Sequence, residues 1–448
     1  MAETIAAIST AMQKGGIAVI RISGDDAFKI ADKVFKGKIE TEKCESHRIL
    51  YGFVYDGEEK IDECLCSVMR APRTFTAENV VELSVHGGLI PAKRTLEAVI
   101  KAGARAAKAG EFTMRAFLNG RIDLSKAEAV ADIIDSKTDL ARSTAVNQLS
   151  GKLSEGINEI RSKILEIMGY ISVSTDFPDE DADSLAGFDT LSELKKLKEK
   201  TEKLIKNADK GIILREGAVC AICGKPNAGK SSLLNELAGE EKAIVTEIEG
   251  TTRDIIEEYI NIYDVPIRLA DTAGIREDAD TVEKIGVKKA RDYIKNADIC
   301  LFITDNGREF DENDAEILNL VKEKPHITVV NKSELEGKCI IPGEEDIIYI
   351  SVKEKTGIEE LKKKIYDLLM GSDFSEDAVM ITNERHKEAA IMADSAIGEA
   401  IKALESGLTE DFSYINLETA VSHLGEITGM TVSDEVIGEV FSKFCIGK

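Results

Sequence analysis

The feature of the sequence that most constrains its fold is a glycine-rich loop with the pattern G-x-x-x-x-G-K-S. The loop runs from Gly224 through Gly229 and Lys230 to Ser231, after the apolar segment AVCAIC and before the helical segment SSLLNELAG. A strand, a tight loop and a helix in this order are typical of a P-loop, whose backbone N–H groups and helix N-terminus bind phosphate. We expect Lys230 to reach the β- and γ-phosphates and the Ser231 hydroxyl to bind Mg²⁺.

Two polar motifs follow at the order and spacing of nucleotide-sensing segments. GTTRD contains Thr251 and Thr252. A threonine here can close over Mg²⁺ and the γ-phosphate and be released when that phosphate leaves. DTAG, from Asp271 to Gly274, ends the apolar segment VPIRLA. Asp271 can hold the metal through water, and the N–H of Gly274 can contact the γ-phosphate, so the two motifs favour a nucleotide-dependent switch.

The segment HITVVNKSE predicts which base is bound. It places Asn331 and Lys332 at the end of an apolar strand, as in the N-K-x-D element of GTPases. A carboxylate in that element accepts two hydrogen bonds from the guanine edge, which adenine cannot offer. Glu334 stands here in place of Asp. Its side chain is one methylene longer, so the direction of its carboxylate toward the base is less tightly fixed. With Ser351 in SVK, where S-A-K usually supports the base, the pattern favours GTP over ATP and disfavours a P-loop kinase.

The residue after Gly274 is Ile275, whereas many small GTPases place a water-orienting glutamine there. An isoleucine cannot position water, so either hydrolysis is very slow or another group supplies the chemistry. Glu283, in TVEKIG, is an acidic candidate downstream. From the residues alone, a solvated glutamate on a helix face is the simpler interpretation of Glu283.

Length and charge limit the remaining possibilities. The chain has 448 residues, which favours two or three domains, and its net charge of −24 disfavours nonspecific binding to nucleic acid as the main activity. The first residues lack the layout of a signal peptide, and no apolar run is long enough to cross a bilayer. We therefore expect a cytoplasmic protein with no membrane partner.

The eight cysteines include two close pairs. Cys220 and Cys223 have C-x-x-C spacing, but they lie in an apolar run, and a strand there would point them to opposite faces. Cys64 and Cys66 in DECLCSVM fit an ordinary strand. No histidine lies near either pair at a spacing that suggests zinc, so we interpret all four as structural.

Three kinds of sequence pattern follow one another, which predicts a multidomain protein with α/β and α+β parts. Residues 1–118 mix strand and helix patterns and predict a compact α+β domain. Residues 119–215 carry apolar residues every three or four positions, and this helical pattern returns in residues 371–448. Residues 216–370 hold the P-loop, so we predict a Ras-like α/β G domain inserted into one all-α helical domain.

Five parts of the sequence stand out together: PNAGKSSLLN, GTTRD, DTAGIRE with VEKIG, the upstream GEFTMRAFLNGRIDLSKAEAVADII and the terminal FCIGK. On these segments, nearly the whole chain resembles the MnmE (TrmE) family of tRNA modification GTPases. It implies an N-terminal domain that binds tetrahydrofolate and forms a homodimer, then a helical domain with an inserted G domain. The three predicted regions follow the same order.

The resemblance also implies a reaction. The family acts with MnmG, a partner that uses FAD and NADH, to place an aminomethyl or carboxymethylaminomethyl group on the wobble uridine of certain tRNAs. The one-carbon unit comes from 5-formyltetrahydrofolate or a related folate. GTP hydrolysis, with a cycle of G-domain pairing, is needed for that chemistry.

Site residues are implied by the same resemblance. K⁺ beside the nucleotide replaces an arginine finger, with Asn227, Thr246, Ile248 and Thr251 as its ligands, and Glu283 orients water. The Mg²⁺ ligands are Ser231, Thr252 and Asp271. The residues expected to contact GTP are Asn227, Ala228, Gly229, Lys230, Ser231, Ser232, Thr246, Thr251, Thr252, Asp271, Gly274, Asn331, Lys332, Glu334 and Ser351.

For folate, the resemblance indicates Arg21, Glu82, Arg121 and Lys448. A carboxylate can hold the donor edge of a pterin, and basic groups can meet its glutamate tail. From the residues alone, Arg21 and Glu82 are more often ordinary paired charges. Cys445 in the terminal FCIGK is a candidate nucleophile, although an exposed terminal cysteine is usually incidental.

A second hypothesis is a regulatory GTPase of ribosome assembly. Such proteins share the G domain and even the P-N-A-G-K-S loop. They usually append a basic RNA-binding module, and none is visible in this sequence. The segments FCIGK and EFTMRAFLNG favour the tRNA-modifying family instead.

Overall fold

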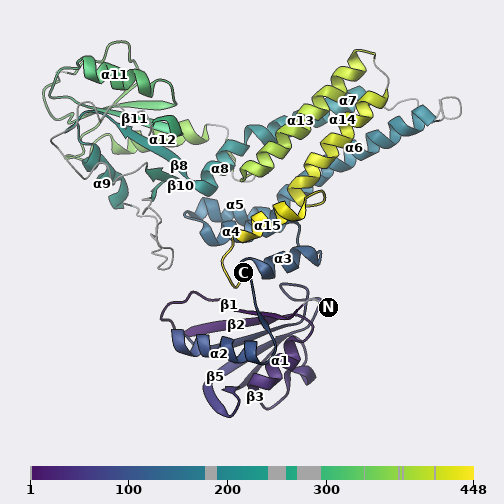
Figure 1. Ribbon diagram of the computed structural model, residues 1–448. Coiled ribbons are helices and arrows are strands. Elements are labelled where there is room, and N and C mark those ends of the chain that lie inside the picture. The colour runs from purple at the N-terminus through teal and green to yellow at the C-terminus, as the bar shows by residue number, and fades with distance from the viewer. Residues whose placement is uncertain are drawn as a thin grey trace. The chain divides into compact units, whose positions relative to one another are not determined.

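The computed structural model of the chain is shown in Figure 1. It describes residues 3–176, 189–240, 259–269, 294–337, 339–371, 374–375, 378–407 and 410–448. The chain divides into two compact units, Met1–Ala131 with Gly425–Lys448, and Asp132–Leu424. The first unit therefore combines both ends of the chain.

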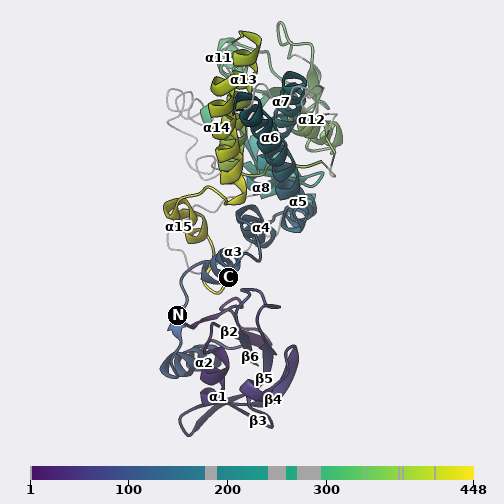
Figure 2. The ribbon, with the colours of Figure 1, turned by 90° about the vertical axis from the view of Figure 1, so that its right-hand side faces the viewer.

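The first unit is built on a seven-stranded sheet with the order β3-β4-β5-β6-β2-β1-β7. Neighbouring strands are antiparallel except β1 and β7, which are parallel. Helices α1 (Ala27–Val34) and α2 (Leu89–Lys101) pack on one face of this sheet (Figure 2). The strands are β1 (Ile5–Ile8), β2 (Ile17–Ser23), β3 (Phe35–Gly37), β4 (Arg48–Asp56), β5 (Glu59–Met69), β6 (Val80–His86) and β7 (Arg105–Ala106).

The two faces of this sheet have different chemistry. Ile20 and Ile22 of β2 and Leu83 of β6 are fully buried in the cluster that includes α1 and α2. Side chains alternate along a strand, so Arg21 and Glu82 lie on the other face. That face, opposite the helices, carries the charged residues predicted to bind folate.

Short helices complete the first unit. They are the 3-10 helix η1 (Thr41–Lys43), α3 (Glu111–Leu118), the start of α4 (Leu124–Asp135) and α15 (Asp434–Ser442). Leu124 and Phe441 pack in one apolar cluster, which joins α4 to α15. Near the end of the chain, Ile446 forms an antiparallel bridge with Ala109. The terminal segment is thereby anchored beside the residues that precede α3.

Long helices form one part of the second unit. Asp394 of α13 accepts hydrogen bonds from Lys198 Nζ at 2.7 Å and from Thr201 Oγ1 at 2.6 Å, both in α7. In the sequence, α7 precedes the second sheet and α13 follows it, so the helical part is assembled from both sides of that sheet. The helices are α5 (Asp139–Ser150), α6 (Lys152–Asp176), α7 (Thr190–Lys206), α8 (Ala208–Glu216), α13 (Glu384–Glu405) and α14 (Glu410–Thr428).

The second sheet has six strands in the order β13-β12-β11-β8-β10-β9. All neighbours are parallel except the hairpin of β9 and β10. The elements are β8 (Ala218–Cys223), α9 (Lys230–Glu240), β9 (Tyr259–Ile262), β10 (Val265–Leu269), β11 (Ile299–Asp305), α11 (Glu312–Val321), β12 (His326–Asn331), β13 (Ile347–Tyr349) and α12 (Ile358–Met370).

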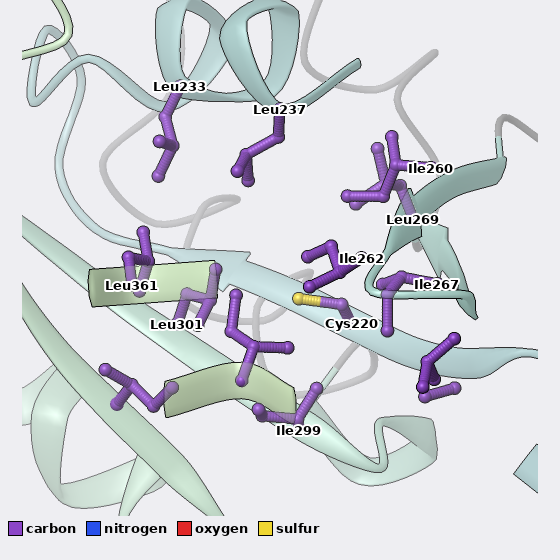
Figure 3. Packing of buried hydrophobic residues seen from close by; sticks show 14 of the residues in the cluster. Cys220, Leu233, Leu237, Ile260, Ile262, Ile267, Leu269, Ile299, Leu301 and Leu361 are labelled. Atoms are coloured by element: carbon purple, nitrogen blue, oxygen red, sulfur yellow. The ribbon is translucent and has the colours of Figure 1, made fainter. Parts of the chain in front are cut away.

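Both faces of the second sheet are buried. Cys220 packs with Leu301 in one apolar cluster (Figure 3), whereas Cys223 packs with Phe302 in another. This confirms the prediction that the two cysteines are buried on opposite faces of a strand. Burial raises the pKa of the Cys223 thiol to about 12, so the reactive thiolate is scarce at neutral pH.

The predicted fold class is confirmed. The N-terminal unit is α+β, the following helices pack together, and the P-loop lies in a mostly parallel α/β sheet. Cys64 and Cys66 lie in a strand, β5, as predicted, and both are buried. Among the described helices, none combines the length and the apolar character that a membrane span requires.

Candidate functional site

The P-loop lies at the carboxyl end of β8 and leads into α9. Gly224 has a φ of +150°, and a Cβ at this position would lie 2.1 Å from the carbonyl oxygen of Ile303 in β11. A side chain would therefore force the loop away from the sheet. At the other end of the loop, Ala228 is buried in the core of the sheet. The loop is thus held against the sheet at both ends.

Gly229 brings the P-loop against the segment predicted to read the base. Its φ is +96°, and a Cβ there would lie 2.1 Å from Nδ2 of Asn331. That amide donates to the carbonyl oxygen of Ala228 at 3.0 Å, and its Oδ1 accepts from the backbone N–H of Val352 at 3.4 Å. Because Val352 follows Ser351, one buried amide joins three segments that were predicted separately.

Lys230 begins α9, and its ammonium lies over the P-loop. Nζ donates to the carbonyl oxygens of Gly224 and Lys225 at 2.7 Å each. Burial lowers the pKa of this ammonium, because the charged form is desolvated there. A phosphate oxygen would offset that desolvation. Ser231 and Ser232, in the first turn of α9, are exposed.

The residues predicted to bind the base converge after β12. Lys332 has a φ of +63°, and its Nζ donates to the carbonyl oxygen of Asn227 at 3.1 Å and lies 2.5 Å from Oδ2 of Asp305. Glu334 is exposed, and a hydrogen bond from Ser351 lowers the pKa of its carboxyl group. Ser351 itself is fully buried. The Asn227 contact joins this segment to the P-loop.

Part of the predicted nucleotide site lies outside the described residues. Thr251, Asp271 and Glu283 belong to this part, and their roles stay predictions. The described hairpin β9–β10 lies between the two undescribed segments in the sequence. The full set outside the described residues is Thr246, Ile248, Thr251, Thr252, Asp271, Gly274 and Glu283.

Three of the residues predicted to bind folate come together on the first sheet. Arg21 and Glu82 are cross-strand partners, and Nε of Arg21 donates to Oε1 of Glu82 at 2.8 Å. The Arg21 guanidinium also lies 5.5 Å from the ring centroid of Phe75 and 5.6 Å from that of Phe112. Arg121 lies 5.1 Å from the same Phe75 centroid and donates to the Phe75 carbonyl at 2.9 Å. The predicted polar residues therefore surround an aromatic pair.

The fourth of these residues, Lys448, reaches the aromatic pair through its backbone. The N–H of Phe112 donates to the carbonyl oxygen of Lys448 at 3.1 Å. Gly447 has a φ of +96°, and a Cβ there would lie 2.3 Å from the carbonyl oxygen of Ile8. Cys445 is exposed, and its carbonyl accepts from the N–H of Lys448 at 3.4 Å. Its role as a nucleophile stays a prediction.

A buried network of charges next to these residues was not predicted from the sequence. Arg115 donates to Glu78 and to Glu111 at 3.1 Å each, and Glu78 also accepts from the Ser23 hydroxyl at 2.7 Å. Burial opposes ionisation of Glu111, but hydrogen bonds from Arg105 and Arg115 outweigh it and hold the pKa of Glu111 at about 2. The four-residue spacing of Glu111 and Arg115 on α3 is the only part of this network with a sequence signal.

The contact at Gly229 predicts the effect of adding one methyl group. We expect Gly229→Ala to weaken GDP binding by at least about 100-fold, roughly 2.7 kcal/mol, because the Cβ would displace Asn331 and strain the loop. Gly239→Ala is the matched control, since a Cβ there meets no atom of the described residues within 4 Å. Titration with a fluorescent GDP, alongside thermal melts that verify folding, measures both variants. An unchanged Kd for folded Gly229→Ala would contradict the prediction.

Comparisons with protein families cover both units. A family model described as MnmE helical domain matches residues 124–445. A second, described as GTP-binding protein TrmE N-terminus, matches residues 4–121. Among solved structures, Era from Aquifex aeolicus bound to GDP and aluminium fluoride is 28% identical, with a TM-score of 0.25 over 40% of this chain and 66% of that chain.

Curated relatives match the chain from end to end. A tRNA modification GTPase MnmE of Acetivibrio thermocellus is 47% identical, over 100% of this chain and 99% of that protein. Another of the same name, from Alkaliphilus metalliredigens, is 44% identical with the same coverage. The chain therefore belongs to the MnmE family of tRNA modification GTPases.

Proposed function

We propose that this protein hydrolyses GTP to drive modification of the wobble uridine of certain tRNAs. It would act with an MnmG-like partner that uses FAD and NADH, and add an aminomethyl or carboxymethylaminomethyl group whose carbon comes from a folate. The observation that carries the proposal is the presence, in one chain of this family, of two assembled sites. One joins the P-loop to a guanine-reading segment, and the other gathers Arg21 and Glu82 around two phenylalanine rings.

In the nucleotide site, each described residue has a separate task. Backbone N–H groups between Gly224 and Lys230, with the N-terminus of α9, bind the phosphates. When the nucleotide binds, the Lys230 ammonium turns from the loop carbonyls and donates its hydrogen bonds to β- and γ-phosphate oxygens. Glu334 accepts hydrogen bonds from the guanine edge, while Asn331 holds the base-reading segment against the P-loop.

Mg²⁺ and K⁺ are the proposed cations of this site. The exposed Ser231 hydroxyl, in the first turn of α9, is a suitable oxygen ligand for Mg²⁺. Asn227 is exposed and has a φ of +65°, so its amide oxygen is accessible to a cation beside the phosphates. When bound, the two cations supply positive charge where negative charge develops during hydrolysis. The other proposed ligands are Thr246, Ile248, Thr251, Thr252 and Asp271.

The proposed chemistry predicts K⁺-stimulated hydrolysis that depends on Glu283. We expect GTP turnover at least about tenfold faster in K⁺ than in Na⁺ at equal ionic strength, because a fixed cation stabilises the transition state. Glu283→Ala should lose the K⁺-stimulated turnover while still binding GTP, because the alanine side chain cannot orient the attacking water. Glu316→Ala, exposed on α11, is the matched control. Equal rates of GTP hydrolysis in the two salts, with no loss of rate in Glu283→Ala, would contradict the mechanism.

The chemistry of the second site supports folate as its ligand. Glu82 presents a carboxylate to pterin N–H groups, and Arg21 and Arg121 offer cations to the glutamate tail. The aromatic pair provides faces on which a flat ring can pack. The neighbouring Thr76 is held by a 2.7 Å contact with the Ser23 hydroxyl, and its carbonyl accepts from Asn119 at 2.7 Å. This second set of contacts keeps the site in place.

Arg21 provides a test of the folate proposal. We expect Arg21→Ala to weaken 5-formyltetrahydrofolate binding at least about tenfold. The substitution removes the guanidinium that pairs with Glu82 and would pair with the glutamate tail of the folate. Arg94→Ala, which removes a similar ion pair with Glu59, should bind folate normally. Calorimetry measures binding. In reactions reconstituted with the flavin partner and tRNA, Arg21→Ala should lower the yield of modified uridine and leave the rate of GTP hydrolysis unchanged. A full yield of modified uridine from this variant would argue against the proposal.

A homodimer is proposed through the open face of the first sheet. Tyr51 of β4 and Leu65 of β5 lie directly opposite each other and are 61% and 46% exposed. Ile49, two residues from Tyr51 on the same face, is 67% exposed. Large apolar side chains gathered on one exposed face are typical of a protein interface. Arg21 and Glu82 share this face, so folate would bind beside the partner subunit.

Two charges on this face test the dimer. We expect the double variant Tyr51→Glu, Leu65→Glu to sediment as a monomer where the unchanged chain sediments as a dimer, because a dimer would bury unpaired carboxylates. Leu89→Glu is the control, since Leu89 is 55% exposed but lies in α2, on the opposite side of the sheet. A dimer that survives the double substitution would refute this interface.

A further inference from the structure

A single tight turn carries the residue predicted to read guanine. The backbone N–H of Leu335 donates to the carbonyl oxygen of Lys332 at 2.9 Å, which closes a turn with Glu334 inside it. Ser333 donates its N–H to the carbonyl of Ile350 at 3.0 Å, next to the loop that holds Ser351. Further contacts of the turn come from the end of β11, which no sequence motif had indicated.

Asp305, the last residue of β11, holds the first residue of the turn. It lies beside Asn331 in the parallel register, and its Oδ2 is 2.5 Å from Nζ of Lys332. Its Oδ1 accepts from the backbone N–H of Gly307 at 2.8 Å, which fixes the carboxylate in place. The same Lys332 ammonium donates to the P-loop carbonyl of Asn227 at 3.1 Å. Asp305 therefore orients the lysine that connects the base-reading turn to the P-loop.

Asn306 holds the other end of the turn. Its side chain is buried, and Nδ2 donates to the carbonyl oxygen of Leu335 at 3.1 Å. Its backbone N–H donates to the carbonyl of Asn331 at 2.9 Å. At the neighbouring Gly307, a Cβ would lie 2.8 Å from the Leu335 side chain, so the chain passes directly beneath the turn. The last residue of β11 and the residue that follows it thus anchor opposite ends of one turn.

Glu334 needs this anchoring because of its length. A glutamate has one more rotatable bond than the aspartate usual at this position, so more conformational freedom is lost when its carboxylate is aimed at a base. The side chain is exposed, and the Ser351 hydroxyl supports it from one side. The direction of the carboxylate therefore depends strongly on the backbone of the turn.

We propose that Asp305 and Asn306 are positioning residues with separate tasks, Asp305 for nucleotide affinity through Lys332 and Asn306 for guanine selectivity through Glu334. This inference rests on the proposed GTP site. Asp305 acts on Lys332, whose ammonium contacts the P-loop, so its effect should not depend on which purine the nucleotide carries. Asn306 acts on the turn whose carboxylate contacts the 2-amino group, which guanine has and hypoxanthine lacks.

Nucleotide selectivity tests the two tasks. Dissociation constants for GDP and inosine diphosphate are measured by displacement of a fluorescent GDP in Mg²⁺. We expect Asp305→Asn to weaken both about tenfold and leave their ratio unchanged. We expect Asn306→Ala to lower the preference for GDP about tenfold, with inosine diphosphate binding changed less than about twofold. Asn306→Asp, nearly isosteric but without the amide donor, should behave in the same way and keeps the test valid if the alanine variant unfolds.

Matched controls separate positioning from a general loss of structure. Asp298→Asn makes the same change immediately before β11, where Asp298 Oδ2 accepts from the N–H of Val219 at 2.7 Å, and Asn313→Ala changes an exposed residue of α11. Both should bind like the unchanged chain. In a chain that already carries Lys332→Ala, Asp305→Asn should cause no further weakening of nucleotide binding, because both changes remove the same contact.

Three results would overturn the inference. The first is an equal loss of GDP and inosine diphosphate binding in the Asn306 variants. The second is full additivity of Asp305→Asn with Lys332→Ala. The third is that every variant binds both nucleotides as tightly as the original chain does, while the original chain prefers GDP. This result would be compatible with the proposed GTP site. If the unchanged chain bound neither nucleotide, the proposed function itself would fall.

Discussion

The hydrogen bond from the Asn331 amide to the Ala228 carbonyl, 3.0 Å long, is the contact on which the nucleotide site depends. It connects loops that follow β8 and β12, two strands separated in the sheet by β11. Parallel strands end at the same edge of a sheet, so loops that are distant in sequence meet there. The contact is possible only because Gly229 has no side chain in the space that the amide occupies.

The end of β11 fills the space between these two loops, and this position explains why it holds the base-reading turn. Asp305 and Asn306 lie where the central strand stops, next to Asn331 in the parallel register. Their side chains reach the turn directly, whereas the P-loop reaches it through Lys332. The proposed phosphate loop and the proposed base-reading turn are therefore connected through one strand end.

The first unit is organised by a different constraint, the antiparallel register of β2 and β6. That register places Arg21 opposite Glu82 on the face away from the helices. The same face receives the rings of Phe75 and Phe112, and the terminal Lys448 contacts the backbone of Phe112. Strand β2, near the beginning of the chain, and the last residue therefore both contribute to the proposed folate site.

Much of the fold and part of the sites could be predicted because the constraints are local. Gly224, Gly229 and Lys230 follow one another in a loop whose backbone has little choice, and the opposite burial of Cys220 and Cys223 follows from strand alternation. The contacts of Glu78 with Arg115 and of Asp305 with Lys332 could not be predicted. Each joins residues that are far apart in sequence, and neither has a motif.

The sequence by itself determined the phosphate loop and predicted the guanine-reading pattern and the order of the domains, whereas the residues proposed for folate came from the resemblance to a family. For the loop and the guanine-reading pattern, the information lies in the identity and spacing of neighbouring residues, which limit backbone conformation and chemistry. Only the tertiary structure decided that Asn306 supports the turn of Glu334, and that Phe75 and Phe112 stand between Arg21, Arg121 and the end of the chain. These contacts depend on strand register and on where loops meet at a sheet edge, and no local pattern specifies either.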